Sequence, residues 1–592
     1  MSRPLSGNRL RRSDSRNEQG YVAILVALLV ATIMLPLCAM AVDVARWYVE
    51  VERLQNAADA AAMAGVTYMP DDLVSARAAA VAAAGRNGFP ASSVTAVAGA
   101  LPTQLRVTIT STVKNSFATA FGLGTNTISR SSVADYNGPA PMGSPCNTFG
   151  NEPMPGTAET LFPGAQMVPP EPVNGALCTT PRFWGGVAGP EHPKANGDAI
   201  MSRRCASSAV SGCTGTTNDE FDPLGYFYIV RVAQPAVNTA VTIQIYDPAF
   251  VETGNQCERA PDNNVTGTAV RNNMNAYDNI TGLSRYAMSA NDYCTGDALT
   301  SGAVAPVTSF ALRGQTDTYR PSDGTPITGC VKQYKGYREA DSVGPKSSRL
   351  RQTLDSGSAN TSYNLELTQL FHQWVTLCTF TPAAKGDYYL QIRTNVPVGG
   401  TADGLGGYAG NANVYTQTGD NTSVMGDGHN RFALRATGPS RASVSISGWE
   451  HMSIYANSTS NPIEFNHVRV IPAAASKTLN IKFFDLGDAP YPGTLQVLPP
   501  RESNLPTPLA GCTGSGVVNG PVTNCQLTNV SRDTGWQAKE QTIRVPIPSG
   551  YTCESTLPGG CWFRLQAAFP GGVQDSTTWS ARVEGDPVRL VE

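Results

Sequence analysis

The residues most able to do chemistry in this chain are its 13 cysteines. Cys38 lies in an apolar run near the N-terminus, and the other twelve form an even set in the part of the chain expected outside the cytoplasm, a pattern typical of disulfides. Short Gly- or Ser-rich spacings predict three pairs: Cys205–Cys213, Cys512–Cys525 and Cys553–Cys561. Sequential pairing of the others is a simple hypothesis: Cys146–Cys178, Cys257–Cys294 and Cys330–Cys378. Thiolate ligation of a metal is less favoured, because the sequence has no Cys-x-x-Cys pair.

Carboxylate and amide side chains at predicted strand ends form a second group. Asp485 and Asp488 lie in one such cluster, and Asp427 and Asn430 lie in another. Ca²⁺ takes six to eight oxygen ligands from groups of this kind, so both clusters are candidates for a structural calcium ion. Aspartates in turns also bond to their own backbone, and neither cluster has EF-hand spacing, so the ion-free alternative stays open. No other cofactor is expected.

Known catalytic motifs are missing from the sequence. It contains no Gly-x-Ser-x-Gly elbow, His-Glu-x-x-His pair, P-loop or Rossmann fingerprint, so we predict that the chain is not an enzyme. Its net charge of −3 at pH 7 argues against a nucleic-acid partner. With 57 glycines, 42 prolines and only 15% charged residues, the composition favours many short strands joined by turns.

The elements that position these residues begin with an uncharged run at residues 21–42. As a helix, this run is long enough to cross a hydrocarbon core of roughly 30 Å. Residues 1–20 carry five arginines against Asp14 and Glu18, so we expect this basic tail in the cytoplasm and the rest of the chain outside it. A cleaved signal peptide is the alternative, but its apolar core usually has only about 7 to 15 residues. We therefore predict a retained single-pass transmembrane helix.

Residues 43–69 continue this helix with an amphipathic pattern. The apolar stripe is bulky up to Leu54 and then becomes small, at Ala58, Ala61 and Ala62, so a neighbour can approach its second half closely. That neighbour is either the chain's own following segment or a partner in the membrane. The second alternative makes these four side chains a partner-packing surface.

Several strings in this region resemble a known family. They are Gln19-Gly20, the stretch AVDVAR at residues 41–46 and the stretch RLQNAADAAAMAG at residues 53–65. Together they resemble the N-terminal module of TadG-type proteins of the Tad (Flp) pilus-assembly system. The resemblance implies a bacterial envelope protein in the cytoplasmic membrane, with other Tad pilus-assembly proteins or pilins as partners. A prepilin would need Glu at the fifth position after Gly20, where this chain has Leu25, so we expect no prepilin cleavage.

The pattern after the helix predicts a small pilin-like α+β stalk module over residues 43–136. It consists of a helix and three strands, with a short helix at residues 115–121; the expected ranges are 73–86, 93–97, 105–113 and 127–134. Residues 137–174 are rich in Gly, Pro, Asn and Ser and are expected to be a linker. Some TadG-type proteins carry an Asp-x-Ser-x-Ser metal site, which residues 575–579 lack, so no adhesion site of that type is expected.

The remaining chain is predicted to be mainly β. Residues 231–247 align without gaps to residues 469–485, and both segments contain a strand, a small-residue turn and a second alternating strand. Chance recurrence of a hairpin is the alternative to a true repeat. We predict two tandem β-sandwiches of jelly-roll-like form, at residues 175–365 with a long insertion and at residues 366–592. A hairpin is expected between residues 371–380 and 388–394.

These observations lead to a functional hypothesis. The chain is expected to be a membrane-anchored, extracytoplasmic structural component of Tad/Flp-type pilus assembly or anchoring. The alternative is a cell-surface adhesin or glycan-binding protein with a TadG-like anchor, in which exposed aromatic residues such as Trp449 stack on sugars.

Overall fold

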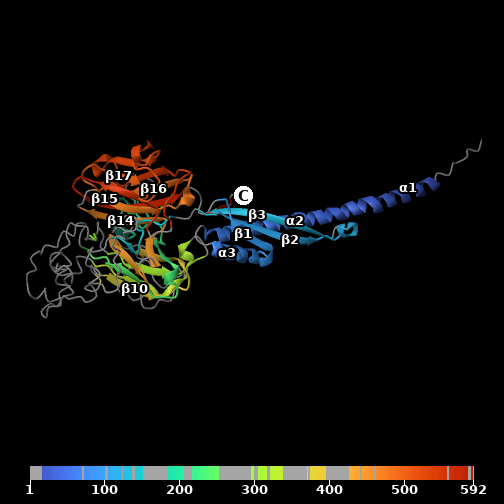
Figure 1. Ribbon diagram of the computed structural model, residues 1–592, viewed down its shortest axis with the longest axis horizontal. Coiled ribbons are helices and arrows are strands. Elements are labelled where there is room, and N and C mark those ends of the chain that lie inside the picture. The colour runs from blue at the N-terminus through green and yellow to red at the C-terminus, as the bar shows by residue number, and fades with distance from the viewer. Residues whose placement is uncertain are drawn as a thin grey trace, which may run out of the picture. The chain divides into compact units, whose positions relative to one another are not determined.

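The computed structural model divides the chain into two compact units (Figure 1). Unit 1 consists of residues 1–136 and 588–592, and unit 2 is the segment 137–587 between them. The structure describes residues 16–590 outside 16 gaps. The residues not described are 1–15, 70–72, 101–103, 123, 137–139, 151–182, 206–216, 253–294, 299–304, 317–319, 338–369, 371–373, 395–425, 441–442, 459–461, 556–558, 584–587 and 591–592.

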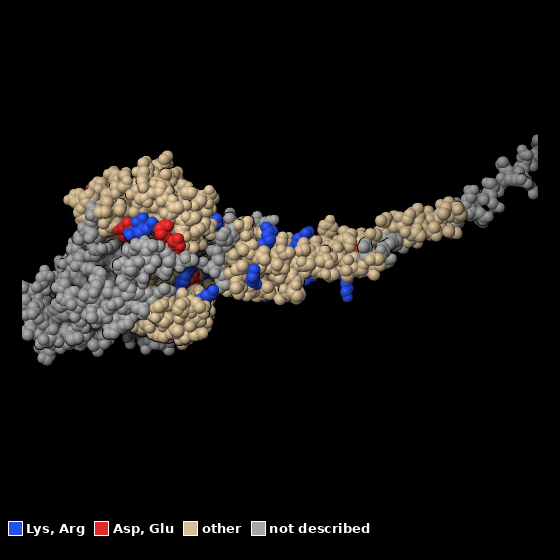
Figure 2. All heavy atoms as spheres, in the orientation of Figure 1, with Lys and Arg blue, Asp and Glu red and all other residues tan. Residues whose placement is uncertain are grey.

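The N-terminal part of unit 1 is one long helical rod. It runs as α1 (Arg16–Leu29), a π-helical turn (Val30–Met34) and α2 (Leu35–Val66). Pro36 lacks the N–H that an unbroken α-helix would use at that position, which accounts for the wider turn just before it. The helical stretch that starts at Tyr21 is long and apolar enough to span a membrane, and its apolar window is not buried. Figure 2 shows this rod without charged side chains along its apolar part.

The second half of α2 packs against a sheet and a second helix. The sheet has the strand order β1 (Val94–Ala98), β2 (Gln104–Lys114), β3 (Thr125–Tyr136) and β24 (Val588–Leu590), and all pairs are antiparallel. The helix α3 (Leu73–Arg86) has the predicted bounds. Three predicted strands are confirmed within a few residues, but β24 was not predicted. The chain's last strand completes the sheet by pairing Val588 with Tyr136.

Unit 2 contains a first eight-stranded jelly roll. Its two sheets have the orders β10-β7-β12-β5 and β6-β11-β8-β9, the arrangement that two interlocked Greek keys produce. The strands are β5 (Trp184–Ala188), β6 (Tyr226–Val232), β7 (Val241–Tyr246), β8 (Thr308–Arg313), β9 (Pro326–Tyr334), β10 (Trp374–Phe380), β11 (Gly386–Thr394) and β12 (His429–Thr437). Two further strands extend it, β4 (Thr148–Phe149) beside β12 and β13 (Val444–Gly448) beside β6.

A second jelly roll follows with the same topology. Its sheets have the orders β21-β16-β23-β14 and β15-β22-β17-β20, and β18 and β19 extend the first of them. The strands are β14 (His451–Ser458), β15 (Ile463–Arg469), β16 (Thr478–Phe484), β17 (Gly493–Leu498), β18 (Thr513–Gly516), β19 (Gly520–Pro521), β20 (Gln526–Val530), β21 (Glu540–Pro546), β22 (Trp562–Ala568) and β23 (Val573–Val583). Pairing of β14 with β5 joins one sheet of the first roll to one sheet of the second, which gives a single 11-stranded sheet.

The structure extends the repeat seen in the sequence from one strand pair to eight strands. In chain order, β5–β12 correspond to β14–β17 and β20–β23, with the same neighbours in both rolls. The turns between the repeated strands also match, because both contain a short 3₁₀ helix followed by a residue with positive φ, Asn238 (58°) or Ser476 (66°). The tandem sandwich layout and its jelly-roll form are therefore as predicted.

The predicted boundary between the rolls, at residues 365 and 366, is wrong. Strands β10 to β13 pair with β6, β7 and β8 of the first roll, so that roll extends to Gly448. The predicted hairpin is wrong for the same reason, since β10 and β11 lie in opposite sheets. A jelly roll pairs strands that are distant in sequence, and alternation of apolar residues shows a strand's face but not its partner.

Two segments expected to be irregular contribute to this architecture. Met142 and Phe149, in the predicted linker 137–174, are fully buried, and Met142 bridges Gly448 and Val468. The predicted insertion at residues 254–363 supplies β8 and β9. These strands were not predicted because the segment's many small and polar residues do not indicate strands.

Candidate functional site

Asp43 connects the N-terminal apolar helix to the sheet module through main-chain hydrogen bonds. Its carboxylate accepts the N–H groups of Ser116, Phe117 and Ala118 at 2.7–2.8 Å. Three donors around one buried carboxylate fix both the helix and the turn, because each bond is charge-assisted. Asp43 in the string AVDVAR thus has a structural role that the sequence alone did not indicate.

Neighbouring side chains of α2 reinforce this connection. The Arg46 guanidinium donates to the Ser116 hydroxyl, and the Trp47 indole donates to Asn115 Oδ1 at 2.8 Å. One turn further along, Glu50 accepts a hydrogen bond from Ser111 on β2 at 2.7 Å. We refer to these contacts between α2 and residues 111–118 as the juxtamembrane lock.

Replacing Asp43 with Ala is expected to release residues 116–118 from α2. Each of the three amides loses a charged acceptor, so their hydrogen exchange should accelerate by about tenfold or more. Exchange followed by mass spectrometry on the full chain in detergent measures this. Asp59→Asn is the matched control, because Asp59 lies on the same helix and accepts a local hydrogen bond from Gln55, one turn earlier, at 2.9 Å. Unchanged exchange at residues 116–118 in the Asp43 variant would contradict the lock.

The predicted partner-packing surface lies inside unit 1. Leu54, Ala58, Ala61 and Ala62 all have 0% exposed surface, and their core also contains α3 alanines and β2 residues such as Leu105 and Val107. The partner hypothesis for these four side chains is therefore corrected: the chain's own following segment covers them. Alanine allows this close approach, and a Cβ on Gly65 would meet the Ala76 carbonyl at 2.5 Å, so Gly65 must stay glycine.

Three disulfides are present among the described residues. Cys330–Cys378 joins β9 to β10 and so links the two sheets of the first roll. Cys512–Cys525 and Cys553–Cys561 close loops of the second roll, as predicted. Cys205 and Cys146 are also disulfide-bonded, whereas Cys213, Cys178, Cys257 and Cys294 lie outside the described residues. The pairing predicted for Cys205 thus stays a prediction.

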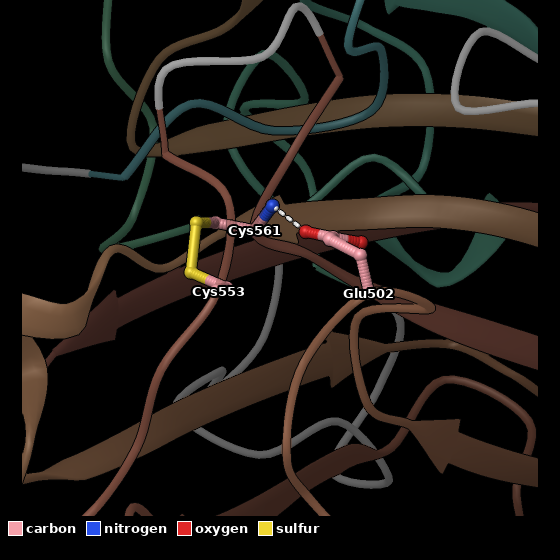
Figure 3. Close-up of side chains that lie close together, drawn as sticks. All are labelled: Glu502, Cys553 and Cys561. Carbon is pink, nitrogen blue, oxygen red and sulfur yellow. Dashed lines mark hydrogen bonds between the residues drawn. A yellow bond between two sulfur atoms is a disulfide. The ribbon is translucent and has the colours of Figure 1, made fainter. Parts of the chain in front are cut away.

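Glu502 lies beside the Cys553–Cys561 disulfide (Figure 3). Its carboxylate accepts the main-chain N–H of Cys561. The two sulfurs and the carboxylate are close enough to resemble a metal-binding group, but both sulfurs are bonded to each other. They have no thiolate to offer, so this group acts as a loop staple.

The calcium candidates fall into two separate places in unit 2. In the first roll, the Asp427 carboxylate is 2.7 Å from Nδ1 of His192, and both side chains are buried. Asn430 donates from its amide nitrogen to the Pro248 carbonyl and to the Thr308 hydroxyl. These contacts occupy the Asp427 carboxylate and the Asn430 amide nitrogen, whereas Asn430 Oδ1 has no hydrogen-bond partner among the described residues. The calcium hypothesis for this pair stays a prediction.

In the second roll, Asp485 and Asp488 do converge, and Asp575 joins them. Asp485 and Asp488 lie just after β16, and Asp575 lies on β23, the neighbouring strand. Asp488 Oδ2 is 3.5 Å from the Ser576 nitrogen. Burial raises the pKa of all three carboxyl groups, and their mutual repulsion raises the pKa values of Asp485 and Asp575 further.

Asp575 was missed because the sequence was searched there only for an Asp-x-Ser-x-Ser string. A usable signal existed in the repeat. In the first roll Ala433 lies opposite Tyr246, and in the second roll Thr578 lies opposite the equivalent residue, Phe484. Three residues earlier on each strand, Asp575 therefore occupies the position that the candidate Asn430 has in the first roll. An alignment that included β12 and β23 would have predicted that Asp575 lies near Asp485.

Comparison with known families gives one match. No curated protein and no solved structure matches the chain. The matching segment, residues 20–69, covers the apolar helix, Asp43 and the buried alanine face described above. Over those residues the chain matches the family model described as putative Flp pilus-assembly TadE/G-like, so its N-terminal helix is similar to a Tad-type element, which supports a pilus-related role.

Proposed function

We propose that this protein is a membrane-anchored, extracytoplasmic structural component of Tad/Flp-type pilus assembly. The observation that carries the proposal is the family match over residues 20–69, which coincides with a helix that fits a single-pass anchor. The arginines before the helix favour a cytoplasmic N-terminus. Disulfides in unit 2 support the same orientation, since they persist in oxidising compartments.

The proposed role is structural. Three closely grouped polar sets have structural explanations: the His192–Asp427 contact, the Lys194–Glu220 ion pair and the Cys553–Cys561 disulfide with Glu502 beside it. The juxtamembrane lock holds the sheet module rigidly on the helix, which suits a component that carries a large unit at a membrane surface. Partners are expected to be other Tad proteins or pilins.

A second candidate is a surface adhesin or glycan-binding protein. The observation in its favour is the pair of jelly rolls, an architecture that lectin domains also use, although fold alone does not decide function. Trp449, named above as a residue that could stack on sugars, packs edge-to-face on Phe227, with 6.5 Å between the ring centroids. That contact gives it a packing role without a ligand.

Deletion in the native host, with complementation by the full chain, separates the two candidates. Loss of pili, counted by electron microscopy, is expected for an assembly component. Normal pili with loss of surface attachment would contradict the proposal and favour the adhesin. Complementation with the Asp43→Ala and Asp59→Asn chains then tests whether the lock matters: only the first is expected to fail, at equal protein levels in the membrane.

A further inference from the structure

The β2–β3 hairpin of unit 1 runs back along α2 toward the apolar part of the rod. Three contacts at 2.7–2.8 Å show this, in the order in which β2 approaches that part: Ser111 with Glu50, Asn115 with Trp47 and Phe117 with Asp43. From the first contact to the last, the partner on α2 moves from residue 50 back to residue 43. The segment after β2 therefore lies at the level of Asp43, and Figure 1 shows the hairpin ending beside the rod, where the rod continues alone.

The tip of this hairpin, residues 116–122, projects beyond the hydrogen bond that closes it. That bond is donated by the Asn115 N–H to the Gly124 carbonyl at 3.1 Å. Within the tip, Gly122, with φ of 83°, turns the chain back toward β3. The tip sequence, SFATAFG, has no charged residue, and Phe117 leaves 46% of its surface exposed. The hairpin thus ends in an uncharged loop with an exposed aromatic ring.

The depth of this tip follows from the length of the apolar run. With residues 21–42 in the hydrocarbon core, Asp43 lies at the edge of that core. The interfacial layer outside the core is roughly 5 to 8 Å thick, which corresponds to about four residues of helix. A carboxylate at this depth is costly unless it is hydrogen-bonded, and the tip supplies its three N–H donors. The tip thus lies in the layer where aromatic side chains are enriched.

The charges near the tip suit the phosphate groups of lipids. Residues 105–134, which contain most of both arms of the hairpin, have three basic residues, Arg106, Lys114 and Arg130, and no Asp or Glu. Lys114 is exposed and directly precedes Asn115 at the base of the tip. On α2, Val44 is 37% exposed beside Asp43, so apolar surface adjoins the tip on the rod as well. Basic residues above an apolar end are typical of an interfacial membrane contact.

We propose that residues 116–122 insert into the interfacial layer of the bilayer that the N-terminal helix crosses, with Phe117 as the anchoring side chain and Lys114 at the lipid phosphates. The proposal rests on the anchoring part of the proposed function. A single helix leaves the rotation of its protein about the membrane normal and its tilt weakly defined. A second point of contact beside the helix fixes the tilt of unit 1, because both points must meet the same surface.

Depth measurements by spin labelling of the full chain in phosphatidylglycerol vesicles test the proposal. A nitroxide on an introduced cysteine reports its depth by its accessibility to oxygen, which is enriched in lipid, and to a nickel chelate, which stays in water. The chain carries Cys38→Ser, because Cys38 is a free and exposed cysteine, and this chain without an added cysteine gives the background. Labels replace Leu28 in the apolar helix, Thr119 in the tip and Ser129, which lies about 14 Å beyond the start of β3.

The labels at Leu28 and Thr119 are expected in lipid, the second within about 10 Å of the boundary between headgroups and acyl chains, and the label at Ser129 is expected in water. A Thr119 label in water together with a Leu28 label in lipid would overturn the proposal and leave the membrane anchor standing. Both labels in water would contradict the anchor as well.

Variants identify the side chains that hold the tip in the membrane. Phe117→Ser should give the Thr119 label the water accessibility of the Ser129 label, while the Leu28 label stays in lipid. Lys114→Gln should remove the greater depth of the Thr119 label in phosphatidylglycerol than in phosphatidylcholine vesicles.

Val97→Ser is the matched control, because Val97 is an exposed apolar residue of β1 in the same sheet, with 39% of its surface exposed. It should leave the depth of the Thr119 label unchanged. An unchanged depth with Phe117→Ser, or an equal loss of depth with Val97→Ser, would contradict the assignment of Phe117 as the anchor.

Discussion

Removing the Cys330–Cys378 disulfide by replacing both residues with alanine is expected to lower the free energy of unfolding of the first roll by about 4 kcal/mol. The bond closes a loop with a sequence separation of 48, and the loss of chain entropy in the unfolded state grows with loop length. Because it also joins β9 to β10, it is a covalent link between the two sheets. Urea unfolding of the full chain, followed by hydrogen exchange in β9 and β10, measures the effect.

The other two disulfides are the matched controls. Cys512–Cys525 and Cys553–Cys561 have sequence separations of 13 and 8, which correspond to about 3 and 2.5 kcal/mol in the same model. The three double-alanine variants should therefore rank by loop length, and the last two should destabilise the second roll. A larger effect from the shortest loop than from Cys330–Cys378 would contradict the chain-entropy account.

Replacing Glu220 with Gln is expected to cost about 3 kcal/mol of stability, the low end of the range for breaking a buried ion pair. Lys194 has no exposed side-chain surface, and its ammonium group lies 2.6 Å from the Glu220 carboxylate. The same carboxylate contacts Lys482 on β16 at 3.2 Å. Without Glu220 the Lys194 charge stays buried and uncompensated, so the loss exceeds that of a surface pair.

The pH dependence of the Glu220 contribution has a definite sign. Burial by itself raises the pKa of Glu220, but the hydrogen bond from Lys194 and the charge of Lys482 outweigh it, so the net pKa is lowered. A lowered pKa in the folded state means that the contribution is present at neutral pH and is lost as the pH falls below about 4.3, the ordinary value for glutamate. The parent and the variant should therefore converge in stability at low pH.

Glu464→Gln is the control for Glu220. Glu464 also contacts two basic side chains, Arg501 and Arg564, but these are 38% and 12% exposed, whereas Lys194 has no exposed side-chain surface. Its removal should cost about 1 kcal/mol or less. Equal losses for the two variants, measured by urea unfolding at pH 7, would mean that the burial of Lys194 is not what sets the cost.

The sequence predicted individual elements well where a local pattern determines them. In β7, Val241, Ile243 and Ile245 are buried while Thr242 and Gln244 are less so, as strict alternation requires. The helix α3 has its predicted ends because alanine favours helix and Gly88, with φ of 87°, stops it. Local propensity is sufficient for such cases.

The sequence did not predict which distant strands meet. The pairing of β24 with β3 depends on three residues at the far end of the chain, too few to show a period. The convergence of Asp575 on Asp485 depends on the pairing of β23 with β16, and the burial of Ala58 depends on the return of α3. Each of these features is set by long-range packing, on which a local pattern carries no information.

The pairing of β24 with β3 also means that the sheet of unit 1 can be completed only after unit 2 has been synthesised. The sheet of unit 1 needs residues from both ends of the chain, and the whole of unit 2 is synthesised between them. At ordinary synthesis rates, β3 is exposed as an open edge for about 20 to 90 s before β24 is made. Synthesis that stops before residue 588 leaves that edge without its β24 partner, so closure of this sheet shows that the chain has been made as far as residues 588–590.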